Sequence, residues 1–107
     1  AGASLIVTVD CGTVAHGAIL EARAAGIDVI VTDHHAPGST LPEALAVVNP
    51  NRPDCSYPDK GLAGVGVSFK LASALALEIG YPLEKLYPLL DLVALATIAD
   101  LAPLTTE

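Results

Sequence analysis

Two short β-branched runs on either side of one helical segment constrain the fold of this chain more than any other feature. The runs are LIVTV at 5–9 and IDVIVT at 27–32. Between them, apolar residues recur at helical spacing over 14–25, Thr13 is a candidate N-cap, and Gly26 is typical of a helix end. Parallel strands need such a crossover, so the sequence predicts a right-handed βαβ unit in which 5–9 is a buried parallel strand.

The rest of the chain continues the same pattern. A third strand is predicted over 45–48, followed by a proline-rich loop over 49–61. Helices are predicted over 63–79 and 89–98, with a short turn over 83–87 between them. We therefore expect an α/β fold, with a parallel sheet in a three-layer arrangement.

The composition limits the size, compartment and partners of the chain. Its 107 residues, 52% of them hydrophobic, are enough for one core, and no apolar run approaches the roughly 18 residues needed to cross a bilayer. We therefore expect a cytoplasmic protein. The formal charge of -7 argues against a basic nucleic-acid surface. The absence of methionine suggests a piece of a longer protein, and Cys11 and Cys55 form no CxxC pair.

Acidic side chains and histidines are expected together at one edge of the sheet. Asp10 ends the first strand and Asp33 ends the second. His34 and His35 follow at once, and Asp100, after the last helix, can return to the same edge. The ends of neighbouring parallel strands lie about 4.8 Å apart, where open α/β sheets bind ligands. Converging carboxylates and imidazoles favour a cation, and mixed oxygen and nitrogen ligands suit Mn²⁺, Zn²⁺ or Fe²⁺.

Each of these residues also has a simpler structural interpretation. An aspartate after a strand is often a turn or capping residue, and a histidine pair on a loop is often surface decoration. The coincidence of two strand-end aspartates with two of the three histidines in the chain favours a metal site. The third histidine, His16, is expected to be an ordinary residue of the first helix.

A Gly-Val-Gly segment and three basic residues are candidate nucleic-acid contacts. Gly64 and Gly66 follow a loop rather than a strand and lack the third glycine of a dinucleotide-binding fingerprint. They either start a helix whose exposed N–H groups hold a phosphate or let that helix pack closely on its neighbours. Arg52, Lys60 and Lys70 flank the segment and are three of only five basic residues, which indicates a path for nucleic acid.

Four blocks of sequence, in this order, resemble the DHH phosphoesterases. They are VDCG at 9–12, VTDHH at 31–35, GLAGVGV at 61–67 and DLVALATIADLAPL at 91–104. The resemblance covers essentially the whole chain and, within the family, is greatest to the single-strand-specific 5′ to 3′ DNA exonucleases. It implies a DHH domain that hydrolyses phosphodiester bonds in DNA recombination and repair.

The resemblance also implies a role for each candidate residue in a two-metal site that uses Mn²⁺ or Mg²⁺. Asp10 matches the family's bridging carboxylate, His34 a metal-ligating imidazole and Asp100 a late carboxylate ligand. His35 matches a histidine expected on the scissile phosphate, and Asp33 would orient the histidines. Two metal ions would activate water and hold the attacking and leaving oxygens, so no serine or cysteine nucleophile is needed.

The chain departs from the family pattern at both ends. The family's Asp-x-Asp motif does not precede Asp10, and the C-terminal substrate-binding domain is absent, so residues 1–107 are expected to be a partial DHH catalytic domain. We expect the isolated chain to bind Mn²⁺ weakly, to lack exonuclease activity and to self-associate through an exposed apolar sheet edge.

The resemblance further implies single-stranded DNA as substrate, a single-strand-binding protein and a helicase as partners, and no membrane. Two alternatives remain open. One is a related DHH enzyme on oligoribonucleotides, cyclic dinucleotides or pyrophosphate, and the other is a binding module that keeps the fold without catalysis. The retention of every matched ligand favours an enzyme, and the blocks around Gly64 and Asp100 favour the DNA exonucleases.

Overall fold

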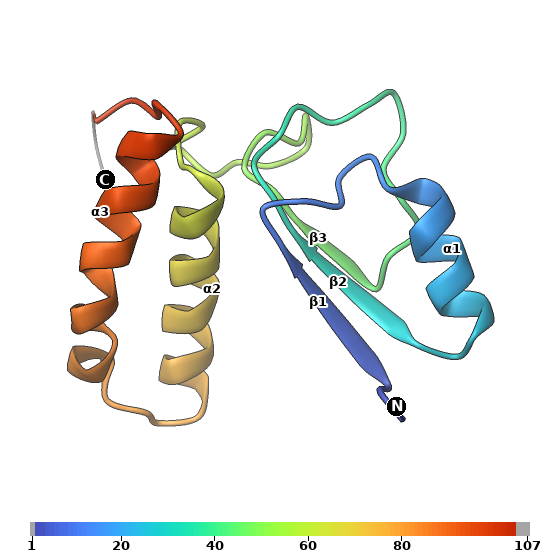
Figure 1. The fold of residues 1–107 in the computed structure, drawn as a ribbon, viewed down its shortest axis with the longest axis horizontal. Coiled ribbons are helices and arrows are strands. Elements are labelled where there is room, and N and C mark those ends of the chain that lie inside the picture. Colours follow the sequence, from blue (N-terminus) through green and yellow to red (C-terminus); the bar gives the residue numbers. More distant parts are fainter. Residues whose placement is uncertain (1, 105–107) are drawn as a thin grey trace.

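The computed structural model describes residues 2–104 and shows the predicted α/β fold (Figure 1). Its elements, in chain order, are β1 (Leu5–Val9), α1 (His16–Ala24), β2 (Asp28–Thr32), β3 (Ala46–Val48), α2 (Gly64–Glu78), the 3₁₀ turns η1 (Leu83–Lys85) and η2 (Tyr87–Leu89), and α3 (Leu90–Ala99). The parallel sheet lies between α1 on one side and α2 on the other, and α3 packs beyond α2 (Figure 1). Each predicted helix and strand is confirmed to within two residues at either end.

The register of the sheet brings the ends of β1 and β2 side by side. β2 is the central strand, and β1 pairs with it in parallel up to Val9 opposite Thr32. The N–H of Asp10 continues this ladder by donating to the Thr32 carbonyl at 3.0 Å. The N–H of Asp33 donates to the Val48 carbonyl of β3, also at 3.0 Å. Both aspartates are therefore held at the same edge of the sheet.

A buried cluster of the core lies between β2 and α1. Val29 and Val31 of β2 pack there with Ile19 of α1 and Val47 of β3. Alternate residues of a strand lie on one face of the sheet, so Val29 and Val31 both point toward this cluster. Val31 is fully buried. The strand that carries the Asp-His-His segment is thus the best anchored of the three.

The two ends of α1 confirm one prediction and correct another. Gly26 follows the helix with φ +74°, the left-handed conformation that favours glycine at a helix end. Thr13 is not the N-cap: Ala15 occupies that position and provides no side-chain cap. Thr13 is instead buried, and its N–H donates to the carboxylate of Asp33. A long-range hydrogen bond has therefore replaced the expected local one.

β1 is parallel, as predicted, but the prediction that it is buried is wrong. Leu5, Val7 and Val9 are each about half exposed, at 47, 47 and 54%. β1 is an edge strand of the described sheet, and the core cluster that α1 forms with β2 and β3 includes no residue of β1, so its side chains are left with little cover. The expected exposed apolar edge is therefore present.

α2 and α3 also carry apolar side chains on their surfaces. α3 has the sequence LDLVALATIA, yet none of its residues is buried. Within residues 2–104, no helix combines the length and apolar character that crossing a membrane requires. Together with β1, these helices leave apolar surface in contact with water. The exposed apolar side chains on α2 and α3 include Leu75, Leu77, Leu92, Leu95 and Ile98.

We expect the 107-residue chain to self-associate, because covering the apolar side chains of β1 removes them from water. Light scattering should show species larger than a monomer. Val7→Lys should shift the chain toward the monomer, because a charge on the edge strand opposes pairing. Val14→Lys is the matched control, since it adds the same charge at an exposed apolar residue outside the sheet. A monodisperse monomer of the unmodified chain would contradict the prediction.

Candidate metal centre

Asp10 directly follows β1 and has an unusual backbone conformation. Its φ is +62°, in the left-handed region that residues other than glycine seldom adopt, although aspartate tolerates it better than most. Such conformations cost of order 1–3 kcal/mol and cluster at functional sites, where the surrounding structure holds them. The N–H of Asp10 stays in the sheet ladder, while its side chain remains 59% exposed at the sheet edge.

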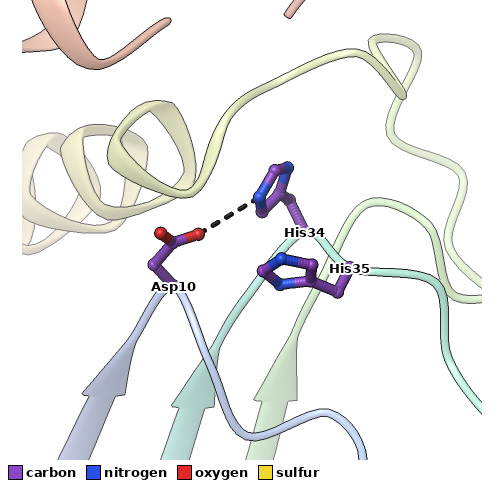
Figure 2. Close-up of side chains that lie close together, drawn as sticks. All are labelled: Asp10, His34 and His35. Carbon is purple, nitrogen blue, oxygen red and sulfur yellow. Dashed lines mark ion pairs between the residues drawn. The ribbon is translucent and has the colours of Figure 1, made fainter. Parts of the chain in front are cut away.

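His34 places a shielded nitrogen between two carboxylates. Its Nε2 lies 3.1 Å from Oδ1 of Asp10 and 3.4 Å from Oδ2 of Asp100, and Figure 2 shows the first of these pairs. Within residues 2–104, no group makes a hydrogen bond of good geometry to this buried nitrogen. A buried polar atom without a partner is costly and rare. The Nε2 atom is therefore suited to a further partner, such as a cation.

The groups around His34 fit a divalent cation. Asp10, His34 and His35 each offer one ligand atom, and these atoms lie within 4.8 Å of one another (Figure 2). Asp100, at the C-terminal end of α3, adds a second carboxylate through its approach to His34. Carboxylate oxygen with imidazole nitrogen suits Mn²⁺, Zn²⁺ or Fe²⁺, and a cation would offset the repulsion between the carboxylates. The structure thus brings together the three residues predicted as ligands.

Asp33 holds the two histidines and is almost fully buried, at 2% exposure. Its Oδ1 accepts the backbone N–H of His34 at 2.8 Å and that of His35 at 3.2 Å. The same oxygen lies 2.7 Å from Nδ1 of the His35 ring. Its Oδ2 accepts the N–H of Thr13 at 2.9 Å. These contacts support the predicted role of Asp33 in orienting the histidines.

The same hydrogen bonds set the charges of Asp33 and His35. Burial by itself raises the pKa of Asp33, but hydrogen bonds from Thr13 and His35 outweigh burial and hold the pKa well below its ordinary value of 3.8. The hydrogen bond to Asp33 raises the pKa of His35 above its ordinary 6.5, against a smaller opposing effect of burial. The His35 side chain is 61% exposed, and its use of Nδ1 toward Asp33 leaves Nε2 for another partner.

Gly64, the first residue of α2, lies against Asp10. A Cβ built at Gly64 would overlap the Asp10 carboxyl group, with Cγ at 2.6 Å. The missing side chain therefore lets the start of α2 approach the sheet edge closely. Gly66 is also buried, and a Cβ there would meet Leu62 at 3.1 Å. Close packing is thus the interpretation that the structure supports for this segment, and contact with nucleic acid stays a prediction.

Two of the three predicted basic contacts stabilise the loop over 49–61. Arg52 donates from Nη1 to the Val47 carbonyl and forms an ion pair with Asp54. Lys60 donates from Nζ to the carbonyls of Pro50 and Cys55. Lys70 lies on the exposed surface of α2. Nucleic-acid binding by these three residues stays a prediction, with a structural role now evident for Arg52 and Lys60.

One hollow borders the centre, and a second lies apart from it. One, of about 450 Å³, is lined by Asp10 and Asp100 together with Gly64 and Ser68 of α2. The other, of about 490 Å³, lies between the loop over 49–57 and α2, has largely apolar walls, and is not lined by the metal-centre residues. Of these two hollows, only the first is bordered by the acidic side chains of the centre.

Thr13, Asn49 and Asn51 also hold the site together, and they were missed as functional residues at the sequence level. Nδ2 of Asn49 donates to Oγ1 of Thr13 and to the carbonyl of His35, each at 2.9 Å. Nδ2 of Asn51 donates to the carbonyl of His34 at 2.6 Å. The available signal was position, since Asn49 directly follows β3 at the edge where the other strand ends carry aspartates.

Known proteins share this architecture. Residues 3–97 match the DHH family, N-terminal domain. The RecJ single-stranded-DNA-specific exonucleases of Escherichia coli and Bacillus subtilis are 53% and 55% identical to this chain over 96% and 99% of its length. The chain spans only 19% and 13% of those two proteins.

Two solved structures are similar over 94% of the chain. One is RecJ from Thermus thermophilus in complex with Mn²⁺, with a TM-score of 0.78 and 46% identity, of which 15% is covered. The other is an exonuclease RecJ bound to manganese, with a TM-score of 0.80 and 44% identity, of which 25% is covered. The ordered sequence blocks, the sheet edge that carries them and the match over residues 3–97 lead to one conclusion: the chain belongs to the DHH family.

Proposed function

We propose that this chain is part of the catalytic domain of a hydrolase that digests single-stranded DNA from the 5′ end, with Mn²⁺ or Mg²⁺ as cofactor. The observation that carries the proposal is the shielded Nε2 of His34 between the carboxylates of Asp10 and Asp100. It supports a cation site, and the 53% identity to a single-stranded-DNA-specific exonuclease supports the substrate. The enzyme would act in DNA recombination and repair, in the cytoplasm.

The proposed activity belongs to a longer protein. The chain spans 19% of its Escherichia coli relative, which supports the interpretation of residues 1–107 as a partial catalytic domain. Further ligands and a substrate-binding domain would then lie elsewhere in the whole protein. The partners proposed for that protein are a single-strand-binding protein and a helicase, because both act on the separated strands that the enzyme would digest.

In this proposal Asp10, His34 and Asp100 hold the cation, and His35 faces the substrate. Divalent cations held by these residues would supply activated water and would stabilise charge on the phosphate. His35 offers its Nε2 to a phosphate oxygen, because Nδ1 is engaged by Asp33 and the hydrogen bond to Asp33 raises the pKa of the ring. Asp33 fixes the His35 ring through Nδ1, and the hollow beside Asp10 gives the phosphodiester room.

Asp10→Ala in the full-length protein should lower exonuclease activity by about 1000-fold, because metal-ion catalysis contributes several kcal/mol to the rate. The assay compares 5′-labelled and 3′-labelled single strands in Mn²⁺, with short RNA and cyclic dinucleotides as competing substrates. Asp28→Ala is the matched control, since Asp28 is an exposed acid at the opposite end of the sheet. Unchanged digestion by the Asp10 variant, or a preference for the competing substrates, would overturn the proposal.

Asp33→Asn should destabilise the metal-free protein by about 2 kcal/mol at pH 7, because the amide replaces a buried, charged acceptor of several hydrogen bonds. Asp10→Asn should change stability by less than about 0.5 kcal/mol, because that side chain is exposed. Thermal unfolding in EDTA measures both. Equal effects of the two substitutions would show that Asp33 is not the structural support of the site.

A further inference from the structure

We propose that Asn49 is a positioning residue of the metal centre, which sets the backbone of the His34-His35 segment through a hydrogen bond to the His35 carbonyl. This inference rests on the proposed function for its catalytic consequence. Its geometry stands on the contacts of one buried side chain. Asn49 follows β3 and is 3% exposed, so its amide depends on partners within the protein.

The Asn49 amide joins the three loops that leave the sheet at the metal-centre edge. Its two donor hydrogens on Nδ2 go to Oγ1 of Thr13, after β1, and to the carbonyl of His35, after β2. Its Oδ1 accepts the N–H of Asn51 at 2.8 Å, within the loop after β3. One side chain thus ties together the ends of all three strands.

The backbone of the histidine segment is held by complementary groups on its two polar sides. Its N–H groups, from His34 and His35, donate to the Asp33 carboxylate. Its carbonyl groups need donors, and these are Nδ2 of Asn49 for His35 and Nδ2 of Asn51 for His34. A carboxylate can only accept, so Asp33 alone cannot fix both sides. Together, the Asp33 carboxylate and the two amides bond the N–H and carbonyl groups of the histidine segment, and the position of this backbone sets the position of the His34 imidazole.

An amide is the group that this position requires. It must donate twice from one atom and accept once from the other, which serine, threonine and ionised aspartate cannot do. Asn49→Asp has nearly the same shape but replaces both donors by an oxygen that faces the His35 carbonyl. The substitution should therefore displace the histidine segment while leaving the packing volume almost unchanged.

The test measures Mn²⁺ affinity of the full-length protein by electron paramagnetic resonance titration, together with kcat and KM on single-stranded DNA. Asn49→Asp should weaken Mn²⁺ binding by about tenfold or more, as changes to the partners of metal ligands commonly do. It should lower kcat while KM changes little. Ile19→Ala is the matched control for lost stability, because Ile19 is buried in the core cluster with Val29, Val31 and Val47 and belongs to α1 rather than to a strand end. Its folded fraction should bind Mn²⁺ as the unmodified protein does.

Asn51→Ala provides a second variant in case Asn49→Asp does not fold, since Asn51 is only partly buried. It should weaken Mn²⁺ binding by about tenfold, the lower end of the effect that loss of a hydrogen bond to a metal ligand commonly has. Unchanged Mn²⁺ affinity in the folded variants, or an equal loss in Ile19→Ala, would overturn the positioning role. If the unmodified protein binds Mn²⁺ but digests no single-stranded DNA, the proposed function fails while the affinity comparison still decides this inference.

Discussion

The buried carboxylate of Asp33 is the interaction on which the rest of the site depends. It lies at the end of the best anchored strand and accepts hydrogen bonds from Thr13, His34 and His35. The pKa of Asp33 is held below the ordinary value. The ionised carboxylate therefore stabilises the fold at any pH above the pKa of a free carboxyl group. This stabilisation is lost as the pH falls below about 4 toward the lowered pKa. Near neutral pH the histidine segment is therefore held by a permanent charge.

Several features near Asp33 are energetically unfavourable, and features of this kind are typical of functional sites. Asp10 has a positive φ, and Nε2 of His34 is buried between two carboxylates without a hydrogen bond among the described residues. Because Gly64 has no side chain, α2 approaches the Asp10 carboxylate more closely than any other residue would allow. A divalent cation would relieve the electrostatic part of these costs. The net charge of -7 thus includes acids that the site itself requires.

The sequence could predict the elements and the residues that converge, because both follow from local patterns. β-branched runs, helical periodicity and strand-end aspartates identify the βαβ unit, and parallel pairing places Asp10 beside Asp33. The residues of β1 predicted a buried strand, and only the resemblance to the family indicated an exposed apolar edge, because exposure depends on what packs against the strand. Thr13 and Asn49 were misjudged or missed because their partners are 20 and 36 residues away, respectively, at other strand ends. Only the assembled sheet edge shows what those polar side chains contact.

In the proposed cation site, His34 lies beside Asp10, and Asp10 lies so close to the start of α2 that the geometry requires Gly64. The direct measurement is the Mn²⁺ affinity of the full-length protein with Gly64→Ala, using Gly17→Ala as control because a Cβ at Gly17 would meet nothing within 4 Å. Gly64→Ala should weaken Mn²⁺ binding by about tenfold or more, because the new methyl displaces the Asp10 carboxylate, and Gly17→Ala should leave it unchanged. Equal Mn²⁺ affinity in the two variants and the unmodified protein would contradict the claim.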